Sequence, residues 1–338
     1  MAHILVTGGG GFIGSHLAKH LRNQGNFVRV ADLTLNGHGS EKYFDEEMLL
    51  DLRVADNCLK VTRGVDLVYN LSANMGGIGF ITQVGADIMR DNLLINVNML
   101  EAARQNKVKR YLFSSSACVY PDYRQKDVDV PGLKETDAYP AEPDTFYGWE
   151  KLAAEKMCEA FAMDYDMDIR VVRYHNIYGP HGTYKGGREK SPAALCRKVA
   201  EADDPGTVSI WGDGEQTRSY CYIDDAVRGT VMLMNSEFEQ PVNIGSDRMV
   251  SVNQLADIII RISGKRIRKI YDPSAPQGVR GRNADITLAK KVLGWEPSIS
   301  LEKGLANTYE WVASMCAEDT VDSAIESHKQ DPAVMTRY

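Results

Sequence analysis

The feature that most constrains the fold of this chain is a glycine-rich stretch near its start, VTGGGGFIGSH. It places Gly8, Gly11 and Gly14 at the spacing G-x-x-G-x-x-G, directly after an apolar run and directly before an amphipathic one. Glycine allows a tight turn and a close approach of the backbone to a ligand. The amino end of a following helix offers free N–H groups and a positive dipole end to a pyrophosphate. A flexible turn would use the same residues, but this position predicts a strand–turn–helix unit that binds a dinucleotide.

Short apolar runs alternate with amphipathic stretches through the first half of the chain. We expect strands at HILVTG (3–8), FVRVAD (27–32), VDLVYNLSA (65–73), RYLFSSS (110–116) and DIRVVRYHNIYG (168–179). We expect helices at SHLAKHLRNQG (15–25), MRDNLLINVNMLEAARQNKV (89–108) and FYGWEKLAAEKMCEAFAMDYD (146–166). This order predicts an α/β fold of the Rossmann type, in which helices cover both faces of a doubly wound parallel sheet.

The pattern becomes less regular after about residue 180. GPHGTYKGGREKSP (179–192) is a loop interrupted by Gly and Pro, and PVNIGS (241–246) returns to strand character. We therefore expect a cofactor-binding domain over residues 1–180, to which later segments return. A smaller C-terminal substrate-binding subdomain is expected mainly over 181–315, and a polar, acidic tail over 316–338.

Composition excludes several other classes of protein. The 39 basic and 46 acidic residues give a net charge of −7 without a dense cluster of Lys and Arg, so we expect no nucleic-acid partner. No signal peptide precedes the first strand, and no apolar run approaches the roughly 20 residues of a membrane span. The six cysteines include no Cys-x-x-Cys pair, so we expect no metal site. Dispersed thiols are typical of a soluble cytoplasmic protein.

An acid follows the glycine loop at the distance that a dinucleotide site requires. Asp32 ends the second expected strand, 18 residues after Gly14, where a carboxylate can accept hydrogen bonds from an adenosine ribose. It would repel a 2′-phosphate, which favours NAD over NADP. The alternative is an ordinary turn acid at a strand end. Asp51 and Leu52 could contact the adenine or could belong to a plain loop.

Tyr147 and Lys151, in the stretch YGWEK, are four residues apart. On a helix they lie on one face, about one turn apart. A lysine beside a phenol favours the phenolate and lowers the pKa of the tyrosine, which could then take a proton from a sugar hydroxyl. An ordinary surface pair would have the same spacing, and only the glycine loop and the strand-end serines favour the catalytic interpretation.

The glycine loop, SSSACVY (114–120) and YGWEK, in this order, resemble the extended short-chain dehydrogenase/reductase superfamily. The resemblance implies that Ser116, Tyr147 and Lys151 form a catalytic trio. Ser116 would hold the 4-hydroxyl of a sugar, Tyr147 would be the acid/base and Lys151 would bind the nicotinamide ribose. The NAD site implied by the resemblance consists of Gly8, Gly11, Phe12, Ile13, Gly14, Asp32, Asp51, Leu52, Leu71, Ala73, Tyr147 and Lys151.

Several longer stretches are more specific than the superfamily. NMGGIGFI (74–81), AYPAEP (138–143), RYHNIYGPHGTYKGGREKSPAALCRK (173–198), WGDGEQTRS (211–219) and GVRGRN (278–283) together resemble the GDP-mannose 3,5-epimerase family. The similarity runs from about residue 3 to residue 312 and includes loops, which have no packing reason to agree. It implies that GDP-mannose and GDP-L-galactose are ligands. It also implies a homodimer in which the helices at 88–106 and 147–164 pair across a two-fold axis.

The same resemblance implies a second pair of acid/base groups, Cys118 and Lys190. We expect Cys118 two residues after Ser116, on the same side of an extended strand. The positions implied for substrate contact are Gly76, Ser116, Ala117, Cys118, Asn176, Glu189, Lys190, Lys198, Gln216, Arg218 and Arg282. The arginines at 218 and 282 are expected to clamp a diphosphate, since guanidinium binds phosphate in a fork. Without the resemblance, Cys118 would be a buried small residue and Lys190 a solvated one.

Three other functions use some of the same residues. A nucleotide-sugar 4-epimerase would need Ser116, Tyr147 and Lys151 alone. A 4,6-dehydratase would carry an Asp-Glu pair where this chain has Ala117 and Cys118. A non-catalytic NAD-binding scaffold would need only the glycine loop.

Overall fold

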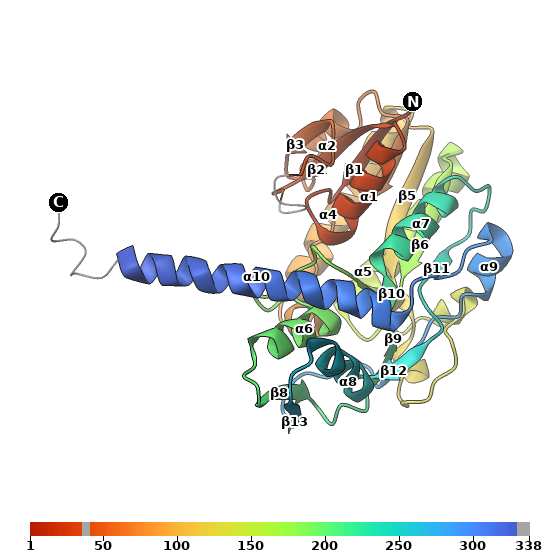
Figure 1. The fold of residues 1–338 in the computed structure, drawn as a ribbon. Helices are drawn as coiled ribbons and strands as arrows, with labels where there is room; N and C mark the ends of the chain where they lie inside the picture. Colours follow the sequence, from red (N-terminus) through yellow and green to blue (C-terminus); the bar gives the residue numbers. More distant parts are fainter. Residues whose placement is uncertain (36–40, 330–338) are drawn as a thin grey trace, which may run out of the picture.

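A seven-stranded parallel sheet forms the centre of the molecule (Figure 1). The computed structural model describes residues 1–35 and 41–329, with side chains for 1–35 and 41–319. The strand order is β11-β6-β5-β4-β1-β2-β3, and every neighbouring pair is parallel. The strands are β1 (His3–Thr7), β2 (Phe27–Asp32), β3 (Glu46–Leu49), β4 (Leu67–Asn70), β5 (Arg110–Ser116), β6 (Ile169–Tyr174) and β11 (Val242–Ile244). The order reverses between β1 and β4, so the predicted doubly wound sheet is confirmed, and ligands of such sheets bind at this reversal.

Helices cover both faces of the sheet because the strands are apolar on both sides. Ile4 and Val6 of β1 belong to one core cluster, and Leu5 between them belongs to a second. The first face is covered by α1 (Phe12–Asn23), α7 (Ile223–Met234) and α9 (Thr287–Leu293). The opposite face is covered by α2 (Ala55–Val61), α4 (Gly85–Gln105) and α5 (Phe146–Tyr165).

The later segments form a smaller layer beyond the carboxyl ends of the central strands (Figure 1). Its helices are α6 (Ser191–Glu201), α8 (Val252–Ser263) and α10 (Leu301–Lys329). Its small sheets are β13 (Ile267–Asp272) with β8 (Gly206–Trp211), β10 (Cys221–Tyr222) with β7 (Ile177–Tyr178), and β12 (Met249–Ser251) with β9 (Thr217–Ser219) and β14 (Gly281–Arg282). The strand β11 comes from this later part of the sequence and pairs with β6 in the central sheet.

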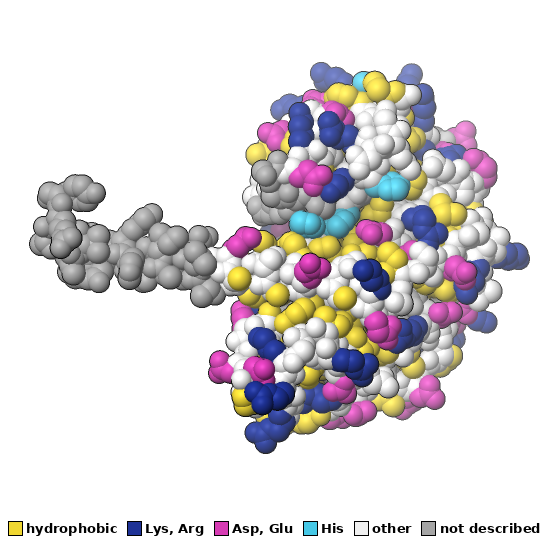
Figure 2. All heavy atoms as spheres, viewed as in Figure 1, with side chains coloured by type: hydrophobic (Ala, Val, Ile, Leu, Met, Phe, Trp, Pro, Cys, Tyr) yellow, Lys and Arg dark blue, Asp and Glu magenta, His cyan; other side chains and the backbone are white. Residues whose placement is uncertain are grey.

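Short elements complete the chain. They are α3 (Ile78–Ile81) and the 3-10 turns η1 (Ala117–Val119), η2 (Asp122–Arg124) and η3 (Glu135–Ala138). No helix in the described part of the chain combines the length and the apolar character needed to cross a bilayer. On the face in Figure 2, acidic and basic side chains are interspersed rather than gathered by sign.

Three local expectations differ from the structure. Cys118 does not continue an extended strand: β5 ends at Ser116 and η1 follows, because the Ser116 hydroxyl accepts a hydrogen bond from the Cys118 N–H (3.2 Å) and caps the turn. The strand expected over 168–179 is divided into β6 and β7 at Asn176, whose φ is +44°. The segment expected as a tail from residue 316 continues α10 as far as Lys329, and residues 330–338 lie outside the described residues.

Candidate active site

Two adjoining cavities open at the carboxyl edge of the central sheet. The first has a volume of about 640 Å³ and the second about 340 Å³. Ser116, Tyr147, Asn176 and Lys190 line both cavities. A ligand in one cavity therefore meets a ligand in the other at these side chains.

The glycine loop forms one wall of the first cavity and has no room for side chains. Gly8 has a φ of +67°, and a Cβ there would lie 2.9 Å from the carbonyl carbon of Leu71. A Cβ on Gly14 would lie 2.1 Å from the Gly8 oxygen. Gly11, the N-cap of α1, supplies no side-chain cap, so the N–H groups of the first turn face the cavity without a competing side chain. This wall fits a pyrophosphate.

Asp32 lies at the end of β2 and is oriented by backbone N–H groups. Gly10 donates to its Oδ2 (2.9 Å) and Leu33 to its Oδ1 (2.7 Å). Burial raises the pKa of Asp32, and these backbone hydrogen bonds oppose the rise. Asp51 also lines the cavity, but its carboxylate is paired with Arg53 (2.7 Å). Asp32 is therefore the acid placed to accept hydrogen bonds from a ribose.

Tyr147 and Lys151 lie in the first two turns of α5, whose N-cap Thr145 accepts a hydrogen bond from Gly148. The Lys151 ammonium is 5.6 Å from the centre of the Tyr147 ring. The predicted lowering of the tyrosine pKa is wrong for the chain without ligands. Burial raises the pKa of Tyr147 well above its ordinary value, and the charges of Glu150 and Cys118 add to the rise.

The described residues fit a bound dinucleotide in this cavity. The Lys151 ammonium is buried and has no hydrogen-bond partner among them, so a ribose hydroxyl would supply one. The residues predicted for the cofactor site all line the cavity: Gly8, Gly11, Phe12, Ile13, Gly14, Asp32, Asp51, Leu52, Leu71, Ala73, Tyr147 and Lys151.

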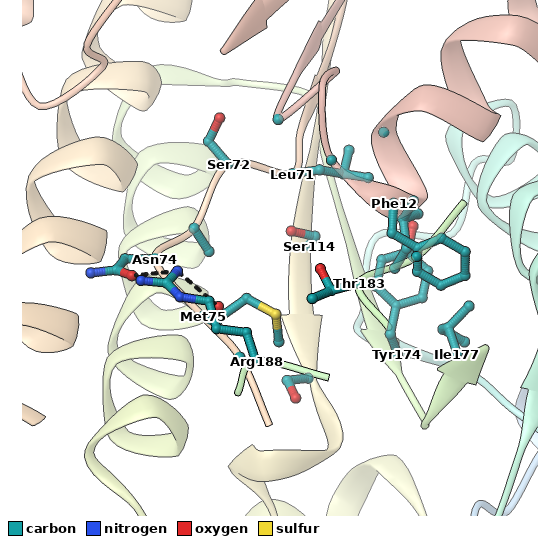
Figure 3. A pocket seen from close by; sticks show the side chains of 18 of the residues that line it. Phe12, Leu71, Ser72, Asn74, Met75, Ser114, Tyr174, Ile177, Thr183 and Arg188 are labelled. Atoms are coloured by element: carbon teal, nitrogen blue, oxygen red, sulfur yellow. Dashed lines mark hydrogen bonds between the residues drawn. The ribbon is translucent and has the colours of Figure 1, made fainter. Parts of the chain in front are cut away.

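The sequence did not point to Arg188 as a site residue. Its guanidinium lines the first cavity, 3.5 Å from the Asn74 Oδ1 and 3.5 Å from the Met75 oxygen (Figure 3). It lies 3.8 Å over the Phe80 ring. Its position in GGREK suggested a loop cation, but no spacing connected it with residues more than a hundred positions earlier. Thr183 and Tyr174 were missed for the same reason and also line this cavity.

The second cavity brings the predicted substrate residues together. Its lining includes Gly76, Ser116, Ala117, Cys118, Asn176, Glu189, Lys190, Lys198, Gln216, Arg218 and Arg282. It also includes Trp211, over whose ring the Lys198 ammonium lies at 5.4 Å. The sequence analysis missed Trp211, although it is the one tryptophan next to the glycines of WGDGEQTRS.

Cys118 lies beside a buried cation in this cavity. The Arg282 Nη1 donates to the Cys118 sulfur at 3.3 Å, and its Nε donates to Gln125. Burial lowers the pKa of Arg282, but the charges of Cys118 and Asp144 outweigh this effect and raise it. A guanidinium at this distance stabilises a thiolate. Arg282 therefore contacts the cysteine in this structure.

Lys190 is the N-cap residue of α6 and opens into both cavities. Its side chain is accessible through the cavities, yet protein surrounds it. This desolvation is the main cause that lowers the pKa of Lys190; Arg282 lowers it further and Cys118 opposes the change. Arg218 donates to the backbone oxygens of Thr217 (2.7 Å) and Val279 (2.6 Å).

A cavity that fits NAD and is lined by Ser116, Tyr147 and Lys151 defines a class of enzyme. Comparison with known proteins agrees. The chain belongs to the NAD dependent epimerase/dehydratase family, whose profile matches residues 4–245. The rice (Oryza sativa subsp. japonica) protein GDP-mannose 3,5-epimerase 1 is 52% identical over 91% of this chain and 81% of its own length. The predicted family is thereby confirmed.

Two solved structures share the fold across almost the whole chain. UDP-glucose 4-epimerase of Thermotoga maritima with UDP-glucose has a TM-score of 0.82 and 30% identity, covering 93% of this chain and 99% of its own. UDP-glucuronic acid 4-epimerase of Bacillus cereus, in complex with UDP-glucuronic acid and NAD, has a TM-score of 0.80 and 27% identity over the same shares. Nucleotide-sugar epimerases are therefore among the known proteins that resemble this chain in sequence and in structure.

Proposed function

We propose that this chain is a GDP-mannose 3,5-epimerase that converts GDP-D-mannose into GDP-L-galactose, with GDP-L-gulose as a side product. The observation that carries the proposal is the pair Cys118 and Lys190, which line one cavity beyond Ser116 and Tyr147. A 4-epimerase needs no such pair. The 52% identity with the rice enzyme, across 91% of the chain, supports the choice of substrate.

The chemistry requires oxidation before inversion. A proton on a saturated sugar carbon is too weakly acidic for a side chain to remove. A ketone at C4 makes the protons at C3 and C5 removable, because the resulting carbanion is delocalised as an enolate. NAD, when bound, accepts the hydride from C4 and returns it at the end. Ser116 holds the 4-hydroxyl, and Tyr147 takes its proton and later gives it back.

Cys118 and Lys190 invert the two carbons beside the ketone. Cys118 acts as the base, because the Arg282 guanidinium at 3.3 Å favours its thiolate. Lys190 acts as the acid, because desolvation lowers its pKa and makes its proton easier to give up. Because Arg282 donates a hydrogen bond to Cys118, Arg218 is the better candidate to bind the diphosphate.

The exchange of solvent deuterium tests the two roles. The wild-type chain with GDP-mannose in deuterated water should incorporate deuterium at C3 and C5. Cys118→Ala and Lys190→Ala should each lose this incorporation, by about a hundredfold or more. Cys316→Ala and Lys185→Ala serve as matched controls, since neither residue lines a cavity described here. Ordinary deuterium uptake at both carbons in either test variant would contradict the assignment.

Product analysis separates the proposal from its rivals. Turnover of UDP-galactose without turnover of GDP-mannose would establish a 4-epimerase, the function of the Thermotoga neighbour. A protein that releases NAD on denaturation but turns over neither sugar nucleotide would be a scaffold. We expect NAD release together with conversion of GDP-mannose.

We further propose that the chain works as a cytoplasmic homodimer through α4 and α5. These helices pack side by side and present exposed apolar side chains, among them Leu94, Val97 and Trp149. The cysteines all lie in the described part of the chain and none of them forms a disulfide there, which supports a reducing compartment.

A further inference from the structure

Glu150 is a fully buried acid that the proposed mechanism does not use. It precedes Lys151 on α5 and has no exposed surface, and its Oε1 is 3.7 Å from the Lys151 ammonium. A buried carboxylate is costly unless it is paired and hydrogen-bonded. The residues around it therefore show which protonation state the fold is built to hold.

One series of hydrogen-bonded side chains connects Thr7, at the glycine-loop end of β1, to Glu150. The Thr7 oxygen accepts hydrogen bonds from the Leu71 and Ser72 N–H groups (3.1 and 3.3 Å), which use both of its lone pairs, so its own proton goes to the Asn70 Oδ1 (2.7 Å). The Asn70 amide then donates to the Asn96 Oδ1 (3.1 Å). This leaves the Asn96 amide N–H to donate to the Glu150 Oε2 (3.4 Å). Backbone donors thus fix the direction of every hydrogen bond in this series of side chains.

A second chain is fixed in the same way. The Asn92 Oδ1 accepts a hydrogen bond from the Asn74 N–H (2.6 Å), which turns the Asn92 amide nitrogen toward the Glu150 Oε1 (2.8 Å). Both carboxyl oxygens of Glu150 therefore accept hydrogen bonds from asparagine amides, and the Lys151 ammonium is its positively charged neighbour. Burial is the largest effect and leaves the pKa of Glu150 above its ordinary value, while Lys151 and Asn92 oppose the rise. The surroundings are arranged for the ionised carboxylate.

We propose that Glu150 is a positioning residue, a buried counter-ion that orients the Lys151 ammonium and places a negative charge beside Tyr147. Its negative charge is the first of the charges that raise the pKa of Tyr147, followed by that of Cys118, while the Ser116 hydroxyl opposes them. Lys151 otherwise faces only the rings of Tyr147 and Phe113, at 5.6 and 4.9 Å.

The sign of the effect follows from charge alone. Glu150→Gln removes a negative charge beside Tyr147, so it should lower the pKa of Tyr147. The deprotonated tyrosine sets the acid limb of the pH–rate profile in the proposed mechanism. This limb should move to lower pH, by on the order of one unit.

The experiment compares two buried acids of one helix. The pH profile of kcat with GDP-mannose is measured for wild type, Glu150→Gln, Glu150→Asp and Glu155→Gln. Glu155 is also buried on α5, but it pairs with Arg173 (2.7 Å) and not with Lys151. We expect the acid limb to shift in Glu150→Gln and to stay in place in the other two variants. A lower kcat with an unmoved acid limb would mean that Glu150 is only structural and would overturn the proposal.

A second readout is independent of the substrate on which the proposed function rests. Alkaline titration of tyrosinate absorbance, compared with Tyr147→Phe, isolates Tyr147 in the protein without added sugar nucleotide. Its transition should fall to lower pH in Glu150→Gln, and an unchanged transition would contradict the proposal even if GDP-mannose is turned over. Failure of GDP-mannose turnover with a shifted transition would instead count against the proposed function alone. If Glu150→Gln does not fold, Glu150→Met removes the same charge with a side chain of similar length and should move the transition in the same direction.

Discussion

Cys118 differs from the other cysteines of the chain in what surrounds its sulfur. Burial raises the pKa of Cys58 to about 12, and it raises the pKa of Cys158, Cys196 and Cys221 still further. Burial also raises the pKa of Cys316 on α10. Cys118 instead accepts a hydrogen bond from the guanidinium of Arg282, at 3.3 Å.

Iodoacetamide should therefore alkylate Cys118 first, because the thiolate is the reactive form and Arg282 stabilises it. Replacing Arg282 with Gln should slow this alkylation by about tenfold, measured by mass spectrometry of the Cys118 peptide over time. Arg280→Gln is a matched control, since Arg280 pairs with Asp213 (2.7 Å) at the surface. First labelling of Cys316, or an unchanged rate in Arg282→Gln, would contradict the role given to the guanidinium.

Sequence patterns located Cys118 but could not show its environment. Its partner Arg282 is 164 residues away in the chain, and no local spacing connects the two. The same holds for Lys190, whose pKa is lowered by desolvation and by the charge of Arg282, a residue 92 positions later in the chain. The cofactor residues Gly8 to Asp32 were easier to predict, since one strand–turn–helix–strand unit contains them all.

At the scale of elements, α4 and α5 carry apolar side chains on a face that no described residue covers. On α5 the exposed residues Phe146, Trp149 and Ala153 follow one another at helical spacing. On α4, Leu94 and Val97 are 40% and 37% exposed. Exposed apolar surface of this extent on two packed helices is typical of a subunit interface.

Leu94→Glu should convert the dimer into a monomer at micromolar concentration. A carboxylate buried in the interface without a partner costs about 2–3 kcal/mol, which weakens association by roughly a hundredfold. Light scattering coupled to size exclusion gives the mass directly. Tyr271→Glu, at an exposed site on β13, should leave the mass unchanged. A monomeric wild type would remove the basis of this prediction.

Hydrophobic periodicity predicted the long helices and the central strands. It failed where a single hydrogen bond or backbone angle determines the local structure. The turn η1 depends on the Ser116 hydroxyl, and the break between β6 and β7 depends on the left-handed backbone of Asn176. Helix α10 is weakly patterned, but Leu305 and Val312 anchor it in the core and Asp319 accepts a hydrogen bond from Tyr184 (2.8 Å). Tertiary contacts of this kind have no sequence period.

At the scale of the whole molecule, a buried histidine joins β6 to β11. The His175 Nε2 hydrogen-bonds the Asn243 Oδ1 (2.9 Å), whose own amide donates to the backbone oxygens of Leu133 and Asp285. Nε2 must therefore carry the proton, and the buried Nδ1 has no partner among the described residues. Burial is the main cause that lowers the pKa of His175 to about 3; the charges of Arg282 and Arg173 contribute, and the hydrogen bond with Asn243 opposes them.

Acid should destabilise the protein through this residue. The folded-state pKa lies below the unfolded value of about 6.5, so the unfolded chain binds the proton first as the pH falls. Stability should be lost from about pH 6.5 downward, by about 2 kcal/mol at pH 5 from this group alone. Urea unfolding at pH 7 and pH 5 measures the loss, which His175→Gln should reduce and His3→Gln, at an exposed site, should not. An equal loss in wild type and His175→Gln would show that His175 is not responsible.

The late strand β11 also has a consequence for how the protein folds. It is the only neighbour of β6 on that side of the sheet, and it pairs with residues 70 positions earlier in the chain. Until it docks, β6 is an open, apolar edge that can pair with another chain. Non-local pairing of this kind is slow to form. Refolding should therefore compete with aggregation at high protein concentration. A chain that stops before Val242 would keep its glycine loop, but β6 would remain exposed as an edge strand.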